Sequence, residues 1–88
     1  MSIEVRVAAL LHAYTRGASV LRADGSTLGE VLDDLETRYP GMRFRLVDEQ
    51  GRPRRHMRFF VNGRDARDIA TRLGDGDKIY IVGALSGG

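Results

Sequence analysis

The 88-residue sequence contains no cysteine and only two histidines. Without cysteine the chain has no disulfide framework, no thiolate metal site and no thiol nucleophile. A zinc site needs three or four converging ligands, and His12 and His56 are far apart and have no carboxylates clustered beside them at ligand spacing. Ser19, Ser26 and Ser86 show no histidine–acid arrangement of the triad kind. We therefore expect neither a metal site nor side-chain catalysis.

Long apolar runs and phosphate-binding loops are also missing. No run approaches the roughly 20 apolar residues that span a bilayer, and the first residues lack the basic region and apolar core of a signal peptide. We therefore expect a cytoplasmic protein without a membrane partner. A glycine-rich phosphate-binding motif is absent as well, so we expect no cofactor bound by this chain.

The length predicts one domain, because typical domains hold about 100 to 150 residues. We expect a folded domain over residues 1–83 and a flexible tail over residues 84–88, which ends in Gly87-Gly88. Glycine adopts backbone angles that are closed to other residues. Such a tail can enter a narrow channel and present the terminal carboxylate of Gly88 to another protein, or it can simply fray like other chain ends.

The charges are unevenly distributed, although the formal net charge is only +2. The segment 28–41 is acidic, and the segment 42–58 is rich in arginine: Arg43, Arg45, Arg52, Arg54, Arg55 and Arg58. A basic patch attracts acidic proteins or nucleic acids, but a solvated surface loop is the commoner explanation. One hypothesis is therefore an RNA-binding module, in which Phe60 or Tyr80 stacks on bases.

Two strands are expected before the first helix. Ile3, Val5 and Val7 alternate with polar or small residues, which is the period of a half-buried strand. After a loop, a second short strand is predicted at residues 18–22, with Val20 pointing inward.

The clearest helix signal spans residues 27–39. Thr27 lies three residues before Glu30, and this spacing is typical of a capping box at a helix start. Apolar residues then follow at helical spacing and form one stripe: Leu28, Val31, Leu32, Leu35 and Tyr39. Pro40-Gly41 ends the helix, because proline disfavours helical angles in the residue before it. The opposite face is expected to be a solvated acidic surface and not a paired-carboxylate site: Asp33, Asp34 and Glu36.

The second half contains a short helical turn, two strands and a hairpin signal. Residues 42–46 form the turn, residues 48–55 a polar loop, and residues 57–61 a strand with Phe59 and Val61 facing the core. Asn62-Gly63 indicates a hairpin, followed by an irregular stretch at 64–73 and a tight turn at 74–77. The last strand, residues 78–82, is expected to point Ile79 and Ile81 inward. The order is ββαββ, with the helix packed across one face of the sheet.

Three motifs together resemble the ubiquitin-like β-grasp fold and, within it, the bacterial sulfur carriers of the MoaD, ThiS and CysO types. They are the helix start TLGEVL at 27–32, the hairpin FVNGRD at 60–65, and DGDKIYIV at 75–82 leading to the Gly-Gly end. Each motif is common, but this order and spacing are fairly specific. The resemblance implies an α+β β-grasp fold with a mixed sheet of four to five strands and one main helix on one face.

The resemblance also implies a function. In that family an E1-like enzyme of the MoeB or ThiF type uses ATP to adenylate the terminal glycine, and sulfur then displaces AMP. Gly88 would carry the adenylate and then the thiocarboxylate, while Leu85, Ser86 and Gly87 would give the tail access to the partner. The chain would be a protein co-substrate and not an enzyme, and a synthase would accept its sulfur.

A docking surface is expected on the side of the sheet away from the helix, because exposed apolar clusters on small proteins mark binding sites. The residues predicted to contact a partner are Ala8, Phe60, Tyr80 and Val82, with Arg6 and Arg58 beside them. The alternative is that some of them pack under the loop that carries Arg43 to Arg55.

Other functions remain open at this point. The chain could be the small subunit of a molybdopterin synthase, a modifier that joins Gly88 to lysines of target proteins, or the RNA-binding module described above. RNA binding gives no reason for a terminal Gly-Gly, so nucleic acid is the less favoured partner. The pathway that receives the sulfur is open among cysteine, molybdopterin and secondary-metabolite synthesis.

Overall fold

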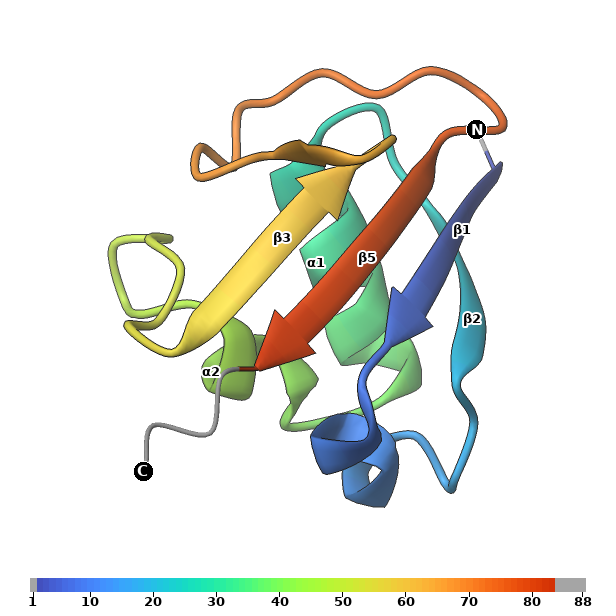
Figure 1. Ribbon diagram of the computed structural model, residues 1–88, viewed down its shortest axis with the longest axis vertical. Helices are drawn as coiled ribbons and strands as arrows, with labels where there is room; N and C mark the ends of the chain where they lie inside the picture. The colour runs from blue at the N-terminus through green and yellow to red at the C-terminus, as the bar shows by residue number, and fades with distance from the viewer. Residues whose placement is uncertain (1, 84–88) are drawn as a thin grey trace.

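The computed structural model describes residues 2–83. Its elements follow in the order β1 (Ser2–Val7), the 3-10 helix η1 (Ala9–Tyr14), β2 (Val20–Asp24), α1 (Leu28–Arg38), α2 (Met42–Leu46), β3 (Met57–Val61), β4 (Arg64–Asp65) and β5 (Lys78–Gly83). One sheet has the strand order β2-β1-β5-β3-β4, in which β1 and β5 are parallel and all other neighbours antiparallel (Figure 1). The predicted α+β fold with a mixed sheet is confirmed.

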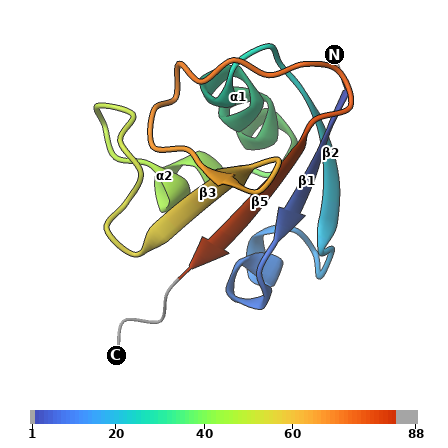
Figure 2. The ribbon, with the colours of Figure 1, turned by 45° about the horizontal axis from the view of Figure 1, so that its top comes forward.

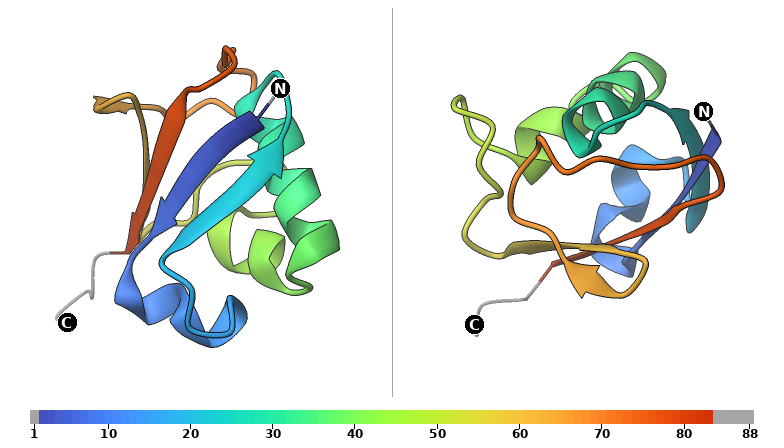
Figure 3. Two further views of the ribbon diagram at one scale, coloured as in Figure 1. Left: turned by 90° about the vertical axis from the view of Figure 1, so that its right-hand side faces the viewer. Right: turned by 90° about the horizontal axis from the view of Figure 1, so that it is seen from above.

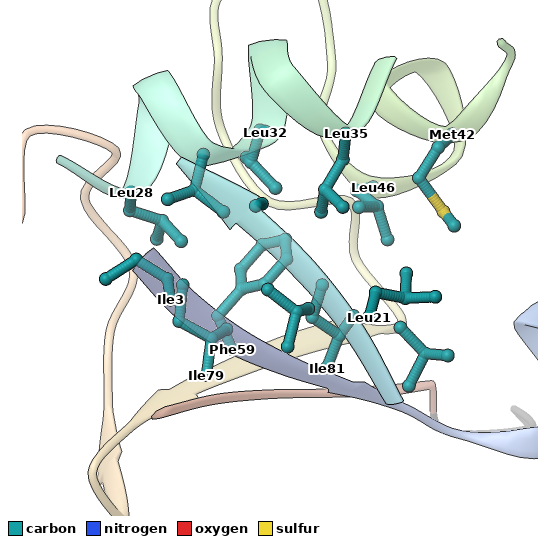
Figure 4. Packing of buried hydrophobic residues seen from close by; sticks show 14 of the residues in the cluster. Ile3, Leu21, Leu28, Leu32, Leu35, Met42, Leu46, Phe59, Ile79 and Ile81 are labelled. Carbon is teal, nitrogen blue, oxygen red and sulfur yellow. The ribbon is translucent and has the colours of Figure 1, made fainter. Parts of the chain in front are cut away.

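The core lies between α1, α2 and one face of the sheet. The apolar stripe predicted for α1 is buried over the length of the helix, at Leu28, Val31, Leu32 and Leu35. Tyr39, just after the helix, is partly buried against the core. From the sheet, Phe59 lies below α1 together with Ile3, Ile79 and Ile81 (Figure 4). A helix of 11 residues is marginal by itself, so this packing is what stabilises α1.

The start of α1 follows the capping pattern with one difference. The Glu30 backbone N–H donates to Oγ1 of Thr27 at 3.1 Å, as expected for a helix cap. The Glu30 carboxylate accepts hydrogen bonds from the backbone N–H and the hydroxyl of Ser26, each at 2.7 Å. These bonds hold the pKa of Glu30 below its usual value. In a capping box the carboxylate would accept the N–H of Thr27; here it binds Ser26, the residue before it.

The second strand is displaced from its expected position. β2 begins two residues later than predicted, and Val20 is 48% exposed. The prediction that Val20 points inward is wrong. Leu21 lies opposite Val5 of β1, and successive residues of a strand point to opposite sides. Leu21 and Ala23 therefore face the core in place of Val20.

The segment after β1 forms η1, which the sequence pattern did not predict. Leu11 from this helix is buried in the core. Tyr14 is partly buried against the core, and the guanidinium of Arg45 lies 5.6 Å from the centroid of its ring. Tyr14 is therefore a core residue.

β3 and the following hairpin match their predictions, with one addition. Phe59 is buried, and Val61 packs partly buried against the core. Asn62 and Gly63 have φ angles of 50° and 85°, which suit an Asn-Gly hairpin. The stretch expected to be irregular from residue 64 onward begins instead with β4, which pairs with β3. Two residues are too few to show the alternation of a strand.

Residues 66–77 lead from the edge strand β4 to the central strand β5 and pass the first turn of α1 (Figure 2). The backbone N–H groups of Leu28 and Gly29 donate to the carbonyls of Thr71 and Ile69 at 2.9 and 2.8 Å. These bonds satisfy two of the N–H groups that a helix start leaves without an internal partner. The connection therefore holds α1 in place over the sheet.

Candidate docking face

One side of the sheet carries no helix in the described part of the chain. Seen from the edge of the sheet, α1 and α2 lie together on one side, while η1 lies at one end (Figure 3). We call the other side the outer face. Its side chains alternate along each strand with those that fill the core.

A row of three predicted docking residues crosses the centre of the outer face. Arg6 of β1 lies opposite Tyr80 of β5, and Tyr80 lies opposite Phe60 of β3. Tyr80 is 51% exposed and Phe60 is half-buried. Directly opposed side chains on neighbouring strands are close enough to interact. The sheet therefore gathers two aromatic rings and one cation at a single place.

The other three predicted residues lie further along the same strands. Arg58 is exposed and lies opposite Val82, which is half-buried. Ala8 is half-buried, and its backbone N–H donates to the carbonyl of Ile81 at 3.0 Å, so the chain stays beside β5 just beyond the end of β1. The exposure of Tyr80 contradicts the alternative that it packs under the loop at 43–55.

A shallow, mostly apolar groove lies on the outer face near the start of β5. Arg6, Phe60 and Tyr80 line it together with Asn62, Gly63 and Lys78. Sequence reasoning did not include the last three residues. Asn62 Oδ1 accepts the backbone N–H of Lys78 at 3.0 Å, which joins the hairpin to β5. The Asn-Gly signal marked this turn, but its position beside β5 depends on the strand order.

The two arginines predicted on the outer face are each paired with a carboxylate. Arg6 Nε donates to Oε2 of Glu4 at 2.9 Å, and this bond holds the pKa of Glu4 below its usual value. Arg58 Nη1 lies 3.5 Å from Oδ2 of Asp65. Apolar area flanked by such charged pairs suits a protein partner that combines apolar residues with complementary charges.

The arginine-rich segment makes its main contacts elsewhere. Arg43 Nε binds Oδ1 of Asp33 on α1 at 2.8 Å. Arg54 donates to the carbonyl of Phe44 at 2.8 Å and lies 4.6 Å from the centroid of its ring. Phe44 is 70% exposed on α2, and sequence reasoning assigned it no role. These contacts place an exposed aromatic ring beside Arg54, at a position other than Phe60 and Tyr80, to which the RNA hypothesis assigned base stacking.

The acidic residues of α1 have structural partners of their own. The Glu36 carboxylate accepts the backbone N–H groups of Gly41 and Arg43 at 3.0 and 2.9 Å. These bonds lower the pKa of Glu36 and cap the start of α2. Asp34 Oδ2 accepts the backbone N–H of Asp24 at 2.8 Å. Glu36 and Asp34 therefore bind backbone groups next to α2 and in β2. The sequence had predicted only a solvated acidic face.

Two further findings concern residues 2–83 alone. No group of three or more His, Asp or Glu side chains in this part of the chain is arranged to hold a metal ion. Within the same residues, no helix has the length and apolar character needed to cross a bilayer.

The expected tail lies outside the described residues, and with it Leu85, Ser86, Gly87 and Gly88. The last described residue is Gly83, at the end of β5. A Cβ atom at Gly83 would meet the side chain of Leu10 and lie 3.3 Å from Sδ of Met57. β5 therefore ends in a narrow space between η1 and the start of β3.

Comparison with known proteins identifies a family. The ThiS family model matches residues 5–88. The sulfur carrier protein CysO of Mycobacterium tuberculosis is 37% identical over 93 residues, which cover 100% of both chains. Small archaeal modifier protein 3 of Haloferax volcanii is 37% identical over 68 residues, which cover 74% of this chain and 73% of the archaeal one.

The fold comparison agrees. A chain in the crystal structure of the Amycolatopsis orientalis BexX/CysO complex superposes with a TM-score of 0.90 at 31% identity. The match covers 98% of this chain and 99% of that chain. The β-grasp architecture expected from the resemblance is therefore confirmed.

Proposed function

Because the chain belongs to the ThiS family, we propose that it is a sulfur carrier protein, a cytoplasmic co-substrate and not an enzyme. The observation that carries the proposal is the family match, which extends through residue 88. Residues 1–83 form the body that partners recognise. Residues 84–88 form the tail, in which Leu85, Ser86 and Gly87 lead to the reactive carboxylate of Gly88.

The carboxylate must be activated before sulfur can be attached, because an ionised carboxylate is a poor electrophile. A carboxylate oxygen of Gly88 attacks the α-phosphorus of ATP, pyrophosphate leaves, and a glycyl adenylate forms. A sulfur nucleophile at the oxidation level of hydrosulfide then attacks the carbonyl carbon. The bond from this carbon to the phosphate oxygen breaks and AMP leaves, so that the tail carries a thiocarboxylate. An E1-like enzyme of the MoeB or ThiF type supplies the ATP site, and a synthase accepts the sulfur.

The outer face supports this proposal, because no helix among residues 2–83 covers it and an activating enzyme can dock there. Tyr80, Phe60 and Val82 supply apolar area, and Arg6 and Arg58 supply cations beside it. β5 carries two of these residues and then leads directly towards the tail.

A second candidate function is protein modification. The similarity to small archaeal modifier protein 3 favours it. In this case the activated Gly88 carbonyl would be attacked by a lysine amine of a target protein. Both functions share the adenylation step and differ in the nucleophile that follows it.

The test is intact-mass analysis of the protein after incubation with an activating enzyme, ATP and a sulfur source. We expect one carboxyl oxygen of Gly88 to be replaced by sulfur. Deletion of Gly88 should abolish this change and leave the thermal unfolding curve almost unchanged. A carboxylate that stays unmodified in the complete reaction would contradict the carrier function, and a bond to lysines of other proteins would favour the modifier.

A further inference from the structure

The chain contains 14 basic residues, of which Lys78 is the single lysine. An arginine guanidinium stays protonated at cellular pH, so it is no nucleophile towards an acyl group. The neutral fraction of a lysine amine is such a nucleophile. A protein with an activated carboxyl group is exposed to attack by amines, and this composition leaves one side-chain amine while keeping the positive charge.

Lys78 occupies a defined place on the outer face. It is exposed, it is the first residue of β5, and it lines the groove with Phe60 and Tyr80. Its backbone is held on both sides by Asn62, whose Oδ1 accepts the Lys78 N–H at 3.0 Å and whose N–H donates to the Lys78 carbonyl at 2.9 Å. The one side-chain amine is therefore presented at the surface proposed for docking.

We propose that Lys78 is a modification site that accepts the activated Gly88 acyl group of a second copy of this chain, which rests on the adenylation proposed above. Neutral Nζ of Lys78 attacks the carbonyl carbon of the glycyl adenylate. The bond from this carbon to the phosphate oxygen breaks, AMP leaves, and the nitrogen releases a proton to solvent. The product is an isopeptide-linked dimer, and ATP is the only co-reactant.

The position of Lys78 gives the link a consequence. A second copy attached in the groove covers Phe60 and Tyr80 of the acceptor. The acceptor then presents no free outer face to the activating enzyme, although its own tail is unused. The link therefore removes two molecules from the carrier cycle and prevents growth through the tail of the acceptor.

The experiment combines the protein with its activating enzyme and ATP and omits the sulfur source. Exchange of labelled pyrophosphate into ATP reports adenylation separately from linkage. We expect a dimer on denaturing gels, with a Gly88–Lys78 isopeptide identified by peptide mass spectrometry. K78R should remove at least nine-tenths of the dimer formed per adenylate.

The outcomes separate the two proposals. Absence of exchange would contradict the adenylation itself. Exchange without a dimer, a link mapped to the α-amino group, or a monomer lighter by one water would overturn the assignment of Lys78 while leaving adenylation intact.

A matched control tests the blocked face. Arg38 is exposed on α1, on the other side of the sheet, so K78R combined with R38K moves the one side-chain amine away from the outer face. The purified dimer linked at Lys78 should show at least tenfold slower exchange than the same amount of monomer. The exchange rate of the dimer linked through position 38 should stay within about twofold of the rate of its own monomer. Equal rates for the two dimers would overturn the blocking effect.

Discussion

Phe60 and Tyr80 lie directly opposite each other on β3 and β5. They are far apart in the sequence, and they meet because β5 returns to the centre of the sheet between β1 and β3. Arg6 joins them from β1 on the same row. This pairing makes the centre of the outer face the first place to test for partner binding.

Y80A should weaken binding to the activating enzyme by about 30-fold, because removal of an aromatic anchor from the centre of an interface costs about 2 kcal/mol. Tyr80 is 51% exposed, so its removal should change the melting temperature little. The measurement is the affinity from titration calorimetry, or the KM for the carrier in pyrophosphate exchange.

F44A is the control for this prediction. Phe44 is also an exposed aromatic residue, at 70%, but it lies on α2 next to Arg54. The variant should bind the activating enzyme like the unaltered protein. A larger loss of affinity for F44A than for Y80A would indicate that the enzyme docks at α2 and not on the outer face.

L32A should lower the free energy of unfolding by about 2–5 kcal/mol, because it leaves a cavity in a packed core. Leu32 is fully buried on α1. V20A should cost less than about 1 kcal/mol, since Val20 is 48% exposed on β2. Urea denaturation measures both values. A loss of unfolding free energy for V20A as large as that for L32A would indicate that Val20 points inward, against the structure.

E36Q should reduce stability at neutral pH and make the protein less sensitive to acid. The pKa of Glu36 is lowered in the folded protein by the N–H groups of Gly41 and Arg43. A lowered carboxyl pKa contributes stability that is present above the unfolded-state pKa and is lost as the pH falls through the folded-state pKa. The difference in melting temperature between the two proteins should therefore shrink as the pH falls below the usual range of a glutamate. A difference that stays constant from pH 7 downward would contradict this role of the charge.

G83A should destabilise the fold by about 1–3 kcal/mol, which is the usual cost of extra volume in a packed site. The added methyl group would meet Leu10 of η1 and approach Met57 of β3. Because the end of the Leu10 side chain is the nearest obstacle, L10A should offset part of the cost in the double variant. A double-mutant cycle by thermal unfolding measures this coupling, and simple additivity would show that the two sites are independent.

Much of the local structure follows from neighbouring residues in the sequence. The alternation of Ile3, Val5 and Val7 predicted β1, and the stripe that includes Leu32 predicted α1 with its buried face. Thr27 and the Asn62-Gly63 pair predicted a helix start and a hairpin, because caps and turns depend on a few adjacent backbone groups. These features were predictable because their physical causes lie within one turn or one strand.

The register of β2 was not predictable in this way. Its side chains alternate whether Val20 or Leu21 faces inward, and a shift by one residue exchanges the two faces. The pairing of Leu21 with Val5 decides the question. η1 and β4 were missed because each is too short to carry a periodic signal. η1 buries Leu11 in the core, whereas β4 is the short return strand of the Asn62-Gly63 hairpin.

The sequence alone determined the local elements, the Gly-Gly end and the single lysine, since these need no knowledge of distant contacts. It also indicated which side chains of β1, β3 and β5 face away from the core. Only the tertiary structure decided that Arg6, Tyr80 and Phe60 form one row and that Lys78 lies in the same groove. The physical reason is the strand order, because the parallel pairing of β1 with β5 joins the two ends of the described chain.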